Sequence, residues 1–259
     1  MIYFDYQYLL FWRQLKIFCK NRTFFASLRK TFNWFVSSIN AGENLTNIPK
    51  SLHMRLLYLD TSPRAERSIS RRLTQSFISS WKNNHTDDIV VYRDLGHVTV
   101  PGVEESWIAA AFSPPETYTP ALTEAIQLSN DLVKEFLSCE RYVIGVPMYN
   151  FGIPSGFKAY IDQIVRVNQT FTVNSQGGYD GLVFNRKMLV ITARGGSYPA
   201  GTPYAQFDFQ EPYIRAIFGM MGVTDITFIH ADNLSMGDEA RQQSLTKAQA
   251  AIEQTVKTW

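Results

Sequence analysis

The sequence predicts an α/β domain built on a doubly wound, five-stranded parallel sheet, preceded by an N-terminal extension. Three observations carry this prediction. Apolar runs of four or five residues recur from Met54 onward, as expected of strands buried on both faces. Segments with apolar residues at helical spacing separate these runs, and parallel strands need such crossover connections. The leading segment differs from the rest in its interleaved aromatic and basic residues.

The elements follow in order along the chain. The expected strands are 56–59, 89–92, 142–146, 188–192 and 226–229. Helical spacing marks 73–81, 122–137 and 157–164, and helices are also expected over 212–221 and 237–257. Pro154 lies near the start of the third helix, where proline is favoured. A small hairpin insertion is expected between Phe171 and Asp180, with Gly177 and Gly178 at its tip.

Bulk composition limits the function classes. The chain has 259 residues, of which 45% are hydrophobic, enough for one substantial core with an appendage. A charged fraction of 19% with 14% aromatic residues argues against disorder. A formal net charge of +2 implies neither a nucleic-acid partner nor a membrane. The sequence contains no run of about eighteen apolar residues, so no transmembrane helix is predicted.

Residues 1–53 form a basic, aromatic-rich extension before the domain expected over 54–259. Seven Lys or Arg against Asp5 and Glu43 give it a net +5, so the remainder carries −3. Asp5, Gln7 and Arg13 interrupt any secretory signal pattern. The extension fits a basic helix on a membrane surface, a segment packed on the domain, a disordered segment, or a start-site artefact, because Met54 opens a strand directly. Residues 40–53 are typical of a linker.

Cysteine and histidine usage favours neither a disulfide framework nor a metal site. Cys19 and Cys139 lie far apart, so a reducing, cytoplasmic compartment is expected, and Cys139 among apolar neighbours is expected to be a buried, inert thiol. The four histidines are scattered without metal-ligand spacing, and each is expected to be an ordinary surface or capping residue. The sequence contains no G-x-S-x-G elbow, so hydrolase chemistry is not indicated.

The loop after the first strand is rich in hydroxyl groups and opens a helix. It contains Ser62, Ser68 and Ser70, and backbone N–H groups at a helix start favour an anion such as a phosphate monoester. It matches neither a Walker loop nor G-x-G-x-x-G. The serines fit simple helix N-caps as well as phosphate ligands, so both interpretations stay open here.

Two further loops follow the third and fourth strands, at the same edge of the expected sheet. Residues 147–155 concentrate flat and soft apolar groups with one amide between prolines, which suits either a planar heteroaromatic ring or a core turn. Residues 192–198 contain Gly195 and Gly196, whose backbone can approach a ligand closely or simply form a flexible turn. Ligands on such sheets bind at the carboxyl ends of the strands.

At these loops the sequence resembles the FMN-dependent NADH azoreductases, within the wider flavodoxin-like NAD(P)H:quinone reductases. The resemblance covers about Met54 to Trp259, and its most specific match is Pro147-Met148-Tyr149-Asn150-Phe151, continuing through Ile153-Pro154-Ser155 to Lys158 and Asp162. It implies a flavodoxin-like fold. It implies FMN phosphate binding by Ser62, Ser68 and Ser70 with the backbone at Ile69, isoalloxazine contacts from Met148, Tyr149, Asn150 and Phe151, and pyrimidine-side contacts from Ala193, Arg194, Gly195 and Gly196.

Two departures from the family pattern bear on these expectations. Ala193 stands where azoreductases often have serine, so a backbone contact would survive there and a hydroxyl contact would not. The family typically lacks an extension such as residues 1–53. The resemblance places Phe151 and Phe171 in the substrate pocket, although Phe171 also fits a core aromatic.

The function implied by the resemblance is an FMN-dependent NAD(P)H oxidoreductase that reduces quinones and azo compounds by two-electron ping-pong transfer through bound FMN. NADH or NADPH is the expected donor, the chemistry needs no protein nucleophile and no metal, and a homodimer is expected to complete the pocket. Two alternatives stay open: a flavodoxin-type carrier of single electrons, and a flavin- or nucleotide-binding module without catalysis. The net charge of −3 in residues 54–259 is mild for an acidic carrier.

Overall fold

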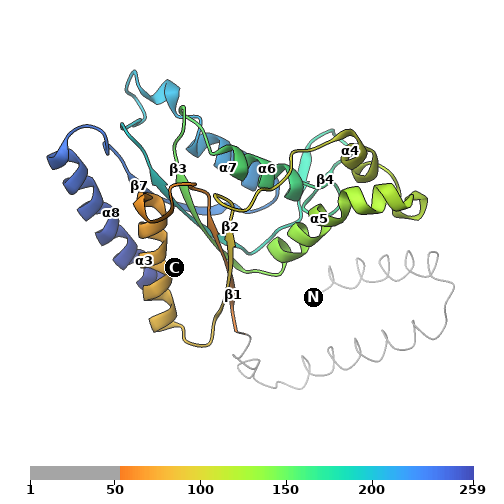
Figure 1. The fold of residues 1–259 in the computed structure, drawn as a ribbon, viewed down its shortest axis with the longest axis horizontal. Helices are drawn as coiled ribbons and strands as arrows, with labels where there is room; N and C mark the ends of the chain where they lie inside the picture. Colours follow the sequence, from red (N-terminus) through yellow and green to blue (C-terminus); the bar gives the residue numbers. More distant parts are fainter. Residues whose placement is uncertain (1–52) are drawn as a thin grey trace, which may run out of the picture. The chain divides into compact units, whose positions relative to one another are not determined.

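The computed structural model describes residues 53–259, which alternate between strands and helices (Figure 1). The strands are β1 (Arg55–Asp60), β2 (Ile89–Asp94), β3 (Arg141–Pro147), β4 (Phe171–Val173), β5 (Tyr179–Gly181), β6 (Lys187–Ala193) and β7 (Asp225–Ala231). The α-helices are α3 (Ile69–Asn84), α4 (Glu105–Ala111), α5 (Pro120–Leu137), α6 (Ser155–Ile164), α7 (Glu211–Met220) and α8 (Asp238–Thr258). Apart from His53, the N-terminal extension and the interpretations attached to it lie outside the described residues.

The predicted five-stranded parallel sheet is confirmed. Its strand order is β2-β1-β3-β6-β7, and every pairing in it is parallel. Tyr58 of β1 lies opposite Tyr92 of β2 on one side and Val143 of β3 on the other. The chain therefore winds outward in both directions from β1 and β3, which is the order expected of a flavodoxin-like fold and leaves a ligand crevice at their carboxyl ends.

Helices cover both faces of the sheet, as Figure 1 shows. Leu56 of β1 packs with Phe77 of α3 in the core that also contains α8, whereas its neighbour Leu57 packs with Phe136 and Phe157 of α5 and α6 on the opposite face. Burying each such side chain contributes about 1.5–3 kcal/mol. Because successive residues of a strand point to opposite faces, the two cores explain the unbroken apolar runs in the sequence.

Helix α4 was not anticipated from the sequence. It has seven residues, and only Trp107 and Ala110 point inward, against Ile126 of α5. The indole Nε1 of Trp107 donates a hydrogen bond to Gln163 Oε1 at 2.7 Å. This anchor compensates for a helix too short to be stable through its own backbone hydrogen bonds.

The predicted hairpin is confirmed as β4 and β5, with Gly177 in the left-handed region at its tip. Gly181 at its base packs so closely that an added Cβ would lie 2.3 Å from the backbone N of Gly222. Gly222 lies between α7 and β7, beside the amino end of β7. The hairpin base is therefore fixed at the sheet edge opposite the carboxyl ends of the strands. None of the helices in residues 53–259 is long and apolar enough to cross a bilayer.

Candidate functional site

The structure brings three loops together at the carboxyl ends of β1, β3 and β6, which are neighbours in the sheet. The Thr61 hydroxyl and N–H both donate to the Gly145 carbonyl oxygen, at 2.8 and 3.2 Å. The Met148 N–H donates to the Ala193 carbonyl oxygen at 2.9 Å, which joins the second loop to the third. The predicted residues on these loops are thus held at one edge by the sheet itself.

The β1–α3 loop forms an anion cradle, a name used here for Ser62, Ser68, Ile69 and Ser70. The three serines are buried, and Ser68 Oγ lies 3.1 Å from Ser70 Oγ. Ser68 is also the N-cap of α3 and accepts a hydrogen bond from the Arg71 N–H at 3.4 Å. Within residues 53–259 the N–H groups of Ile69 and Ser70 have no acceptor. Two free N–H groups at the start of a sixteen-residue helix, beside three hydroxyls, suit a phosphate monoester.

The β3–α6 loop contains a tight turn that sequence propensities do not indicate. Tyr149 and Gly152 exchange two backbone hydrogen bonds, of 3.2 and 3.0 Å. Between them, Asn150 and Phe151 both have positive φ, 47° and 67°. Two left-handed central residues define a type I′ turn, in which asparagine is common and a bulky residue such as phenylalanine is strained. Strain of this kind is concentrated at functional sites.

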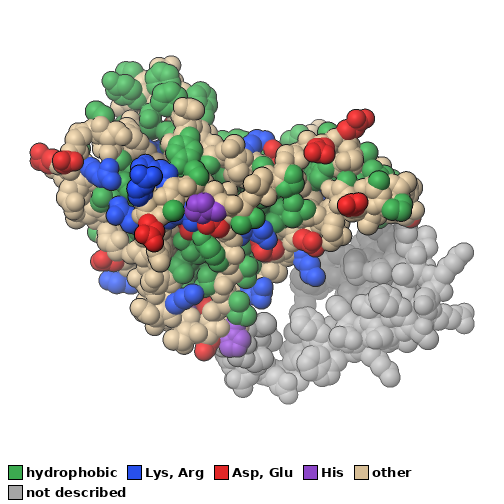
Figure 2. All heavy atoms as spheres, viewed as in Figure 1, with side chains coloured by type: hydrophobic (Ala, Val, Ile, Leu, Met, Phe, Trp, Pro, Cys, Tyr) green, Lys and Arg blue, Asp and Glu red, His purple; other side chains and the backbone are tan. Residues whose placement is uncertain are grey.

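The turn directs Phe151 outward, where it meets aromatic residues from the segment between β6 and α7. We call residues 198–209 the aromatic strap. The Phe151 ring stacks on Phe207 at a centroid distance of 5.1 Å and meets Tyr198 edge-on at 6.1 Å. The Phe209 N–H donates to the Phe151 carbonyl oxygen at 3.1 Å. Figure 2 shows hydrophobic side chains gathered at the top of the view, over the segment that Figure 1 places between β6 and α7.

The aromatic strap is part of the site that sequence reasoning missed. Tyr204 and Phe209 are 63% and 62% exposed although both are large and apolar. The available signal was the clustering of Tyr198, Tyr204, Phe207 and Phe209 in a segment with no helical or strand periodicity. Exposed apolar groups grouped around a site mark a binding surface.

The β6–α7 loop offers backbone donors at two glycines. The carbonyl oxygens of Gly195 and Gly196 accept hydrogen bonds from Ser235 and Asn233, which fixes the loop. In the described part of the chain, the N–H groups of Gly195 and Gly196 have no acceptor. The Arg194 N–H, in contrast, donates to the Ala231 carbonyl oxygen at 2.8 Å. Gly195 and Gly196 therefore provide two N–H donors that this loop can present to a ligand.

The Arg194 side chain braces the site from inside. Its Nε and Nη2 donate to the two carboxylate oxygens of Asp232 at 2.6 and 3.0 Å, and Nη1 donates to Asp208 at 2.9 Å. The side chain is only 4% exposed, and its guanidinium lies 5.6 Å from the ring centroid of Tyr198. Asp208 in turn accepts from the Glu211 N–H at the start of α7. Arg194 thus links the glycine loop, the strap and α7.

Phe171, which was predicted to belong to the site, does not lie near the three loops of its own chain. It pairs with Gly181 at the base of the hairpin, and its ring meets Tyr179 edge-on at 5.7 Å. The hairpin base is packed against Gly222 at the opposite edge of the sheet. Phe171 can therefore reach a site at the carboxyl edge only if that site belongs to another copy of the chain.

Reactive groups outside the loops have structural surroundings. Cys139 is buried, as expected, and burial raises the pKa of its thiol. His85 is the C-cap of α3 and His97 forms a hydrogen bond with Asp94, in agreement with the capping and surface roles expected of them. The same expectation was wrong for His230, which is partly buried in β7, where its ring nitrogens lie 2.8 Å from Thr192 Oγ1 and from Glu211 Oε2. The chemistry available at the carboxyl edge is therefore binding and orientation by hydroxyls, N–H groups and aromatic rings.

Comparisons with known proteins agree with this arrangement. Residues 54–256 match the model of a family described as having a flavodoxin-like fold. Over 205 residues, 79% of this chain and 99% of the relative, the sequence is 60% identical to a protein of Trichormus variabilis named FMN-dependent NADH:quinone oxidoreductase 2.

Two solved structures from Bacillus anthracis are similar in fold. An azoreductase superposes with a TM-score of 0.74 at 24% identity, over 80% of this chain and all of that one. An FMN-dependent NADH-azoreductase in complex with FMN superposes with a TM-score of 0.69 at 25% identity, over 78% of this chain and 99% of that one. The chain therefore belongs to the flavodoxin-like family that contains the FMN-dependent NADH:quinone oxidoreductases.

Proposed function

We propose that this protein is an FMN-dependent NADH oxidoreductase that reduces quinones and azo compounds by two-electron ping-pong transfer, with residues 54–259 as its catalytic domain. The observation that carries the proposal is the convergence of the anion cradle, the aromatic turn and the glycine donors on one sheet edge. The 60% identity to a quinone oxidoreductase over almost its whole length supports the same activity.

The donor set fits FMN. The cradle offers Ser62, Ser68 and Ser70 hydroxyls with the free N–H groups at Ile69 and Ser70, which suit a phosphate dianion. For the ring system we propose the following residues: Met148, Tyr149, Asn150 and Phe151 from the turn, and Ala193, Gly195 and Gly196 from the glycine loop, with Arg194 holding that loop through its side chain. Free N–H groups beside aromatic walls are what a planar ring with carbonyl oxygens requires.

FMN, when bound, would supply the redox chemistry, which is a two-electron exchange between NADH and the oxidised substrate. The protein's residues bind and orient. The free N–H groups of Gly195 and Gly196 would donate to a carbonyl oxygen of a bound ring, a preorganised form of electrostatic stabilisation. Phe151, Phe207 and Tyr198 provide an apolar wall that favours planar substrates. Donor and acceptor use the same exposed surface in turn, which predicts ping-pong kinetics.

We further propose a homodimer in which Phe171 serves the site of the partner copy. The hairpin holds Phe171 away from the loops of its own chain. The α4 region exposes Ile108 and Phe112, 48% and 75% accessible, a pair of large apolar groups suited to a subunit contact. Sedimentation analysis of the full chain is expected to give twice the monomer mass, and Phe112→Glu is expected to lower it. A monomer that reduces quinone at full rate would contradict this arrangement.

We propose a cytoplasmic location because the one cysteine in residues 53–259 is a free, buried thiol. We also propose that quinones are better acceptors than azo dyes, since both are planar but the dyes are bulkier. Turnover with a benzoquinone and with an azo dye, compared at saturating NADH, checks this. Equal or faster azo reduction would count against it.

The central experiment is the visible absorption spectrum of the purified full chain. Flavin bands are expected to bleach on anaerobic addition of NADH and to return with benzoquinone, while NADPH serves as the comparison donor. A single step of bleaching favours the reductase over a carrier of single electrons. A protein that neither retains nor rebinds FMN would refute the proposed function, provided that its circular dichroism shows the α/β fold.

A further inference from the structure

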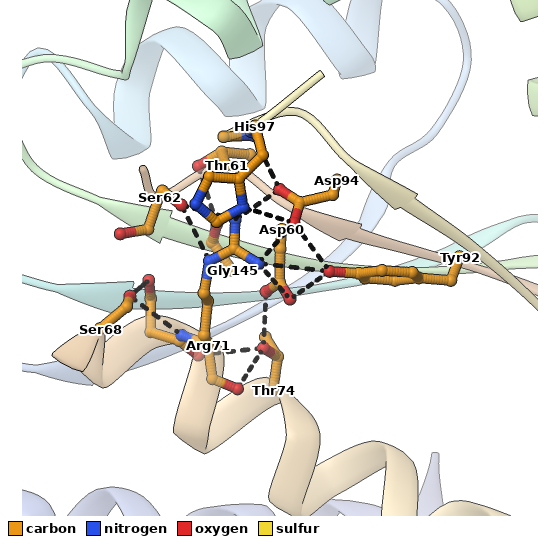
Figure 3. A network of polar contacts seen from close by, with 12 residues as sticks. Asp60, Thr61, Ser62, Ser68, Arg71, Thr74, Tyr92, Asp94, His97 and Gly145 are labelled. Carbon is orange, nitrogen blue, oxygen red and sulfur yellow. Dashed lines mark hydrogen bonds and ion pairs between the residues drawn. The ribbon is translucent and has the colours of Figure 1, made fainter. Parts of the chain in front are cut away.

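Behind the anion cradle, one arginine joins the β1–α3 loop to the end of β2 (Figure 3). Arg71 is the third residue of α3 and directly follows Ser70. Its Nε and Nη2 donate to the Ser62 carbonyl oxygen at 2.8 and 2.6 Å. Its Nη1 donates to Asp94 Oδ2 at 2.9 Å, and Nη2 contacts the other oxygen of the same carboxylate. The side chain therefore fastens the loop to the last residue of β2.

All three nitrogen atoms of the guanidinium have acceptors in this network. Besides Asp94, Nη1 lies 3.4 Å from Asp60 Oδ2 and 3.2 Å from the Tyr92 hydroxyl. The acceptors are the Ser62 carbonyl oxygen and polar side chains at the ends of β1 and β2, and none of them is a hydroxyl or N–H group of the cradle (Figure 3). A guanidinium that is engaged in this way holds the loop from behind and has little left to offer a phosphate.

The charges of the network also point to a structural use of the cation. The side chains of Arg71, Asp60 and Asp94 are 12%, 4% and 19% exposed, so one cation serves two largely buried carboxylates. Burial raises the pKa of Asp60 in spite of hydrogen bonds to its charged form. Burial also acts on Asp94, but hydrogen bonds from Arg71 and His97 outweigh it and lower the pKa of that carboxyl. The positive charge of Arg71 is thus balanced by the carboxylates of Asp60 and Asp94.

The loop after β2 closes over the same carbonyl group. The Gly96 N–H donates to Asp94 Oδ1 at 3.0 Å. A Cβ added at Gly96 would lie 2.1 Å from the Ser62 carbonyl oxygen and 2.6 Å from Arg71 Nη2. Backbone from the two loops is therefore in direct contact, with the Arg71 guanidinium beside it, and this contact restricts the orientation of the Ser62 peptide.

We infer that Arg71 is a positioning residue that preorganises the β1–α3 loop for a phosphate group and so makes the site select FMN over riboflavin. The inference rests on the proposed function, because it concerns the loop proposed to hold the FMN phosphate. The isoalloxazine ring uses the other two loops, which Arg71 does not touch in the described structure. Loosening Arg71 should therefore weaken binding of the phosphate and leave binding of the ring unchanged.

The test compares two flavins on the full-chain apoprotein, by quenching of flavin fluorescence. Arg71→Lys keeps the positive charge but cannot make the forked contact to the Ser62 carbonyl and Asp94 together. We expect it to raise the Kd for FMN on the order of tenfold, the lower end of the range seen when residues that orient metal ligands are mutated. The Kd for riboflavin, which has no phosphate, should change by less than about twofold. Arg72→Lys, at the exposed neighbouring position, is the matched control and should leave both constants unchanged.

Two further variants make the result decisive. Asp94→Asn removes one acceptor charge and should reproduce the selective loss of FMN affinity even if Arg71→Lys folds poorly. Phe151→Ala, on the ring side, should weaken both flavins equally. Equal losses for FMN and riboflavin in Arg71→Lys and Asp94→Asn, or no loss in either, would overturn the role given to Arg71. Wild-type protein that binds no FMN would instead refute the proposed function.

Discussion

Phe151 offers a direct measure of the strain stored at the site. Its φ of 67° lies in the left-handed region, which costs an L side chain about 1–2 kcal/mol. The residue is 43% exposed and its ring stacks on Phe207, so removing the ring should cost about 1–2 kcal/mol in lost burial and aromatic contact. Phe151→Ala loses the ring and keeps the strain. Phe151→Gly loses the ring but relieves the strain, so glycine should be the more stable variant by about 1 kcal/mol.

Urea unfolding of the full chain, followed by circular dichroism, measures this difference. In thermal unfolding of a domain of this size, the same difference of about 1 kcal/mol would appear as a Tm difference of about 2–4 °C. The matched control is Tyr149, two residues earlier in the same turn, which is outside the left-handed region. There the usual order should hold, with Tyr149→Ala more stable than Tyr149→Gly. If alanine equals or exceeds glycine at position 151, the reasoning from turn strain is wrong.

Three other predictions concern the surroundings of the loops. Gly96→Ala should weaken FMN binding because its Cβ would overlap the cradle backbone, whereas Gly102→Ala, with nothing within 4 Å, should not; equal affinities by fluorescence titration would contradict this. Burial and the charge of Arg194 lower the pKa of His230, so the stability that neutral His230 contributes is present above about pH 6.5 and is lost as pH falls. His230→Gln should flatten the decline in unfolding free energy between pH 7.5 and 5.5, by urea titration; an unchanged slope would exclude the assignment. Arg194→Met should lower that free energy by about 3 kcal/mol at neutral pH, because it leaves two partly buried carboxylates, Asp208 and Asp232, without their cation. A loss below about 1 kcal/mol would show that the ion pairs are not needed.

The sheet was predictable because its strands are buried on both faces. Leu56 and Leu57 belong to different cores, and only a doubly covered strand makes consecutive apolar residues necessary. The hairpin was predictable from Gly177 and Gly178 between two short strands. The three site loops followed from their place after strands in a parallel sheet, together with the resemblance of residues 147–155 to a known family.

Features that depend on pairing between distant residues were not predictable. From the sequence alone, Arg71 on a helix would be expected to be an exposed cation. Its acceptors Asp60 and Asp94 become neighbours only when β1 and β2 pair. The left-handed turn at Asn150 and Phe151 runs against local preference, since phenylalanine is not a turn residue. Such local conflicts are expected where function, rather than folding, selects the residue.

The hairpin formed by β4 and β5 joins a rigid base to an unconstrained tip. Gly181 has backbone atoms packed against it, whereas Gly177 has nothing within 4 Å and already adopts φ of 78°. Short peptide insertions should therefore be tolerated at the tip and rejected at the base. A fluorophore placed at the tip would lie at the edge of the sheet opposite the three loops of its own chain, and its emission would be expected to change when a partner copy packs against the hairpin.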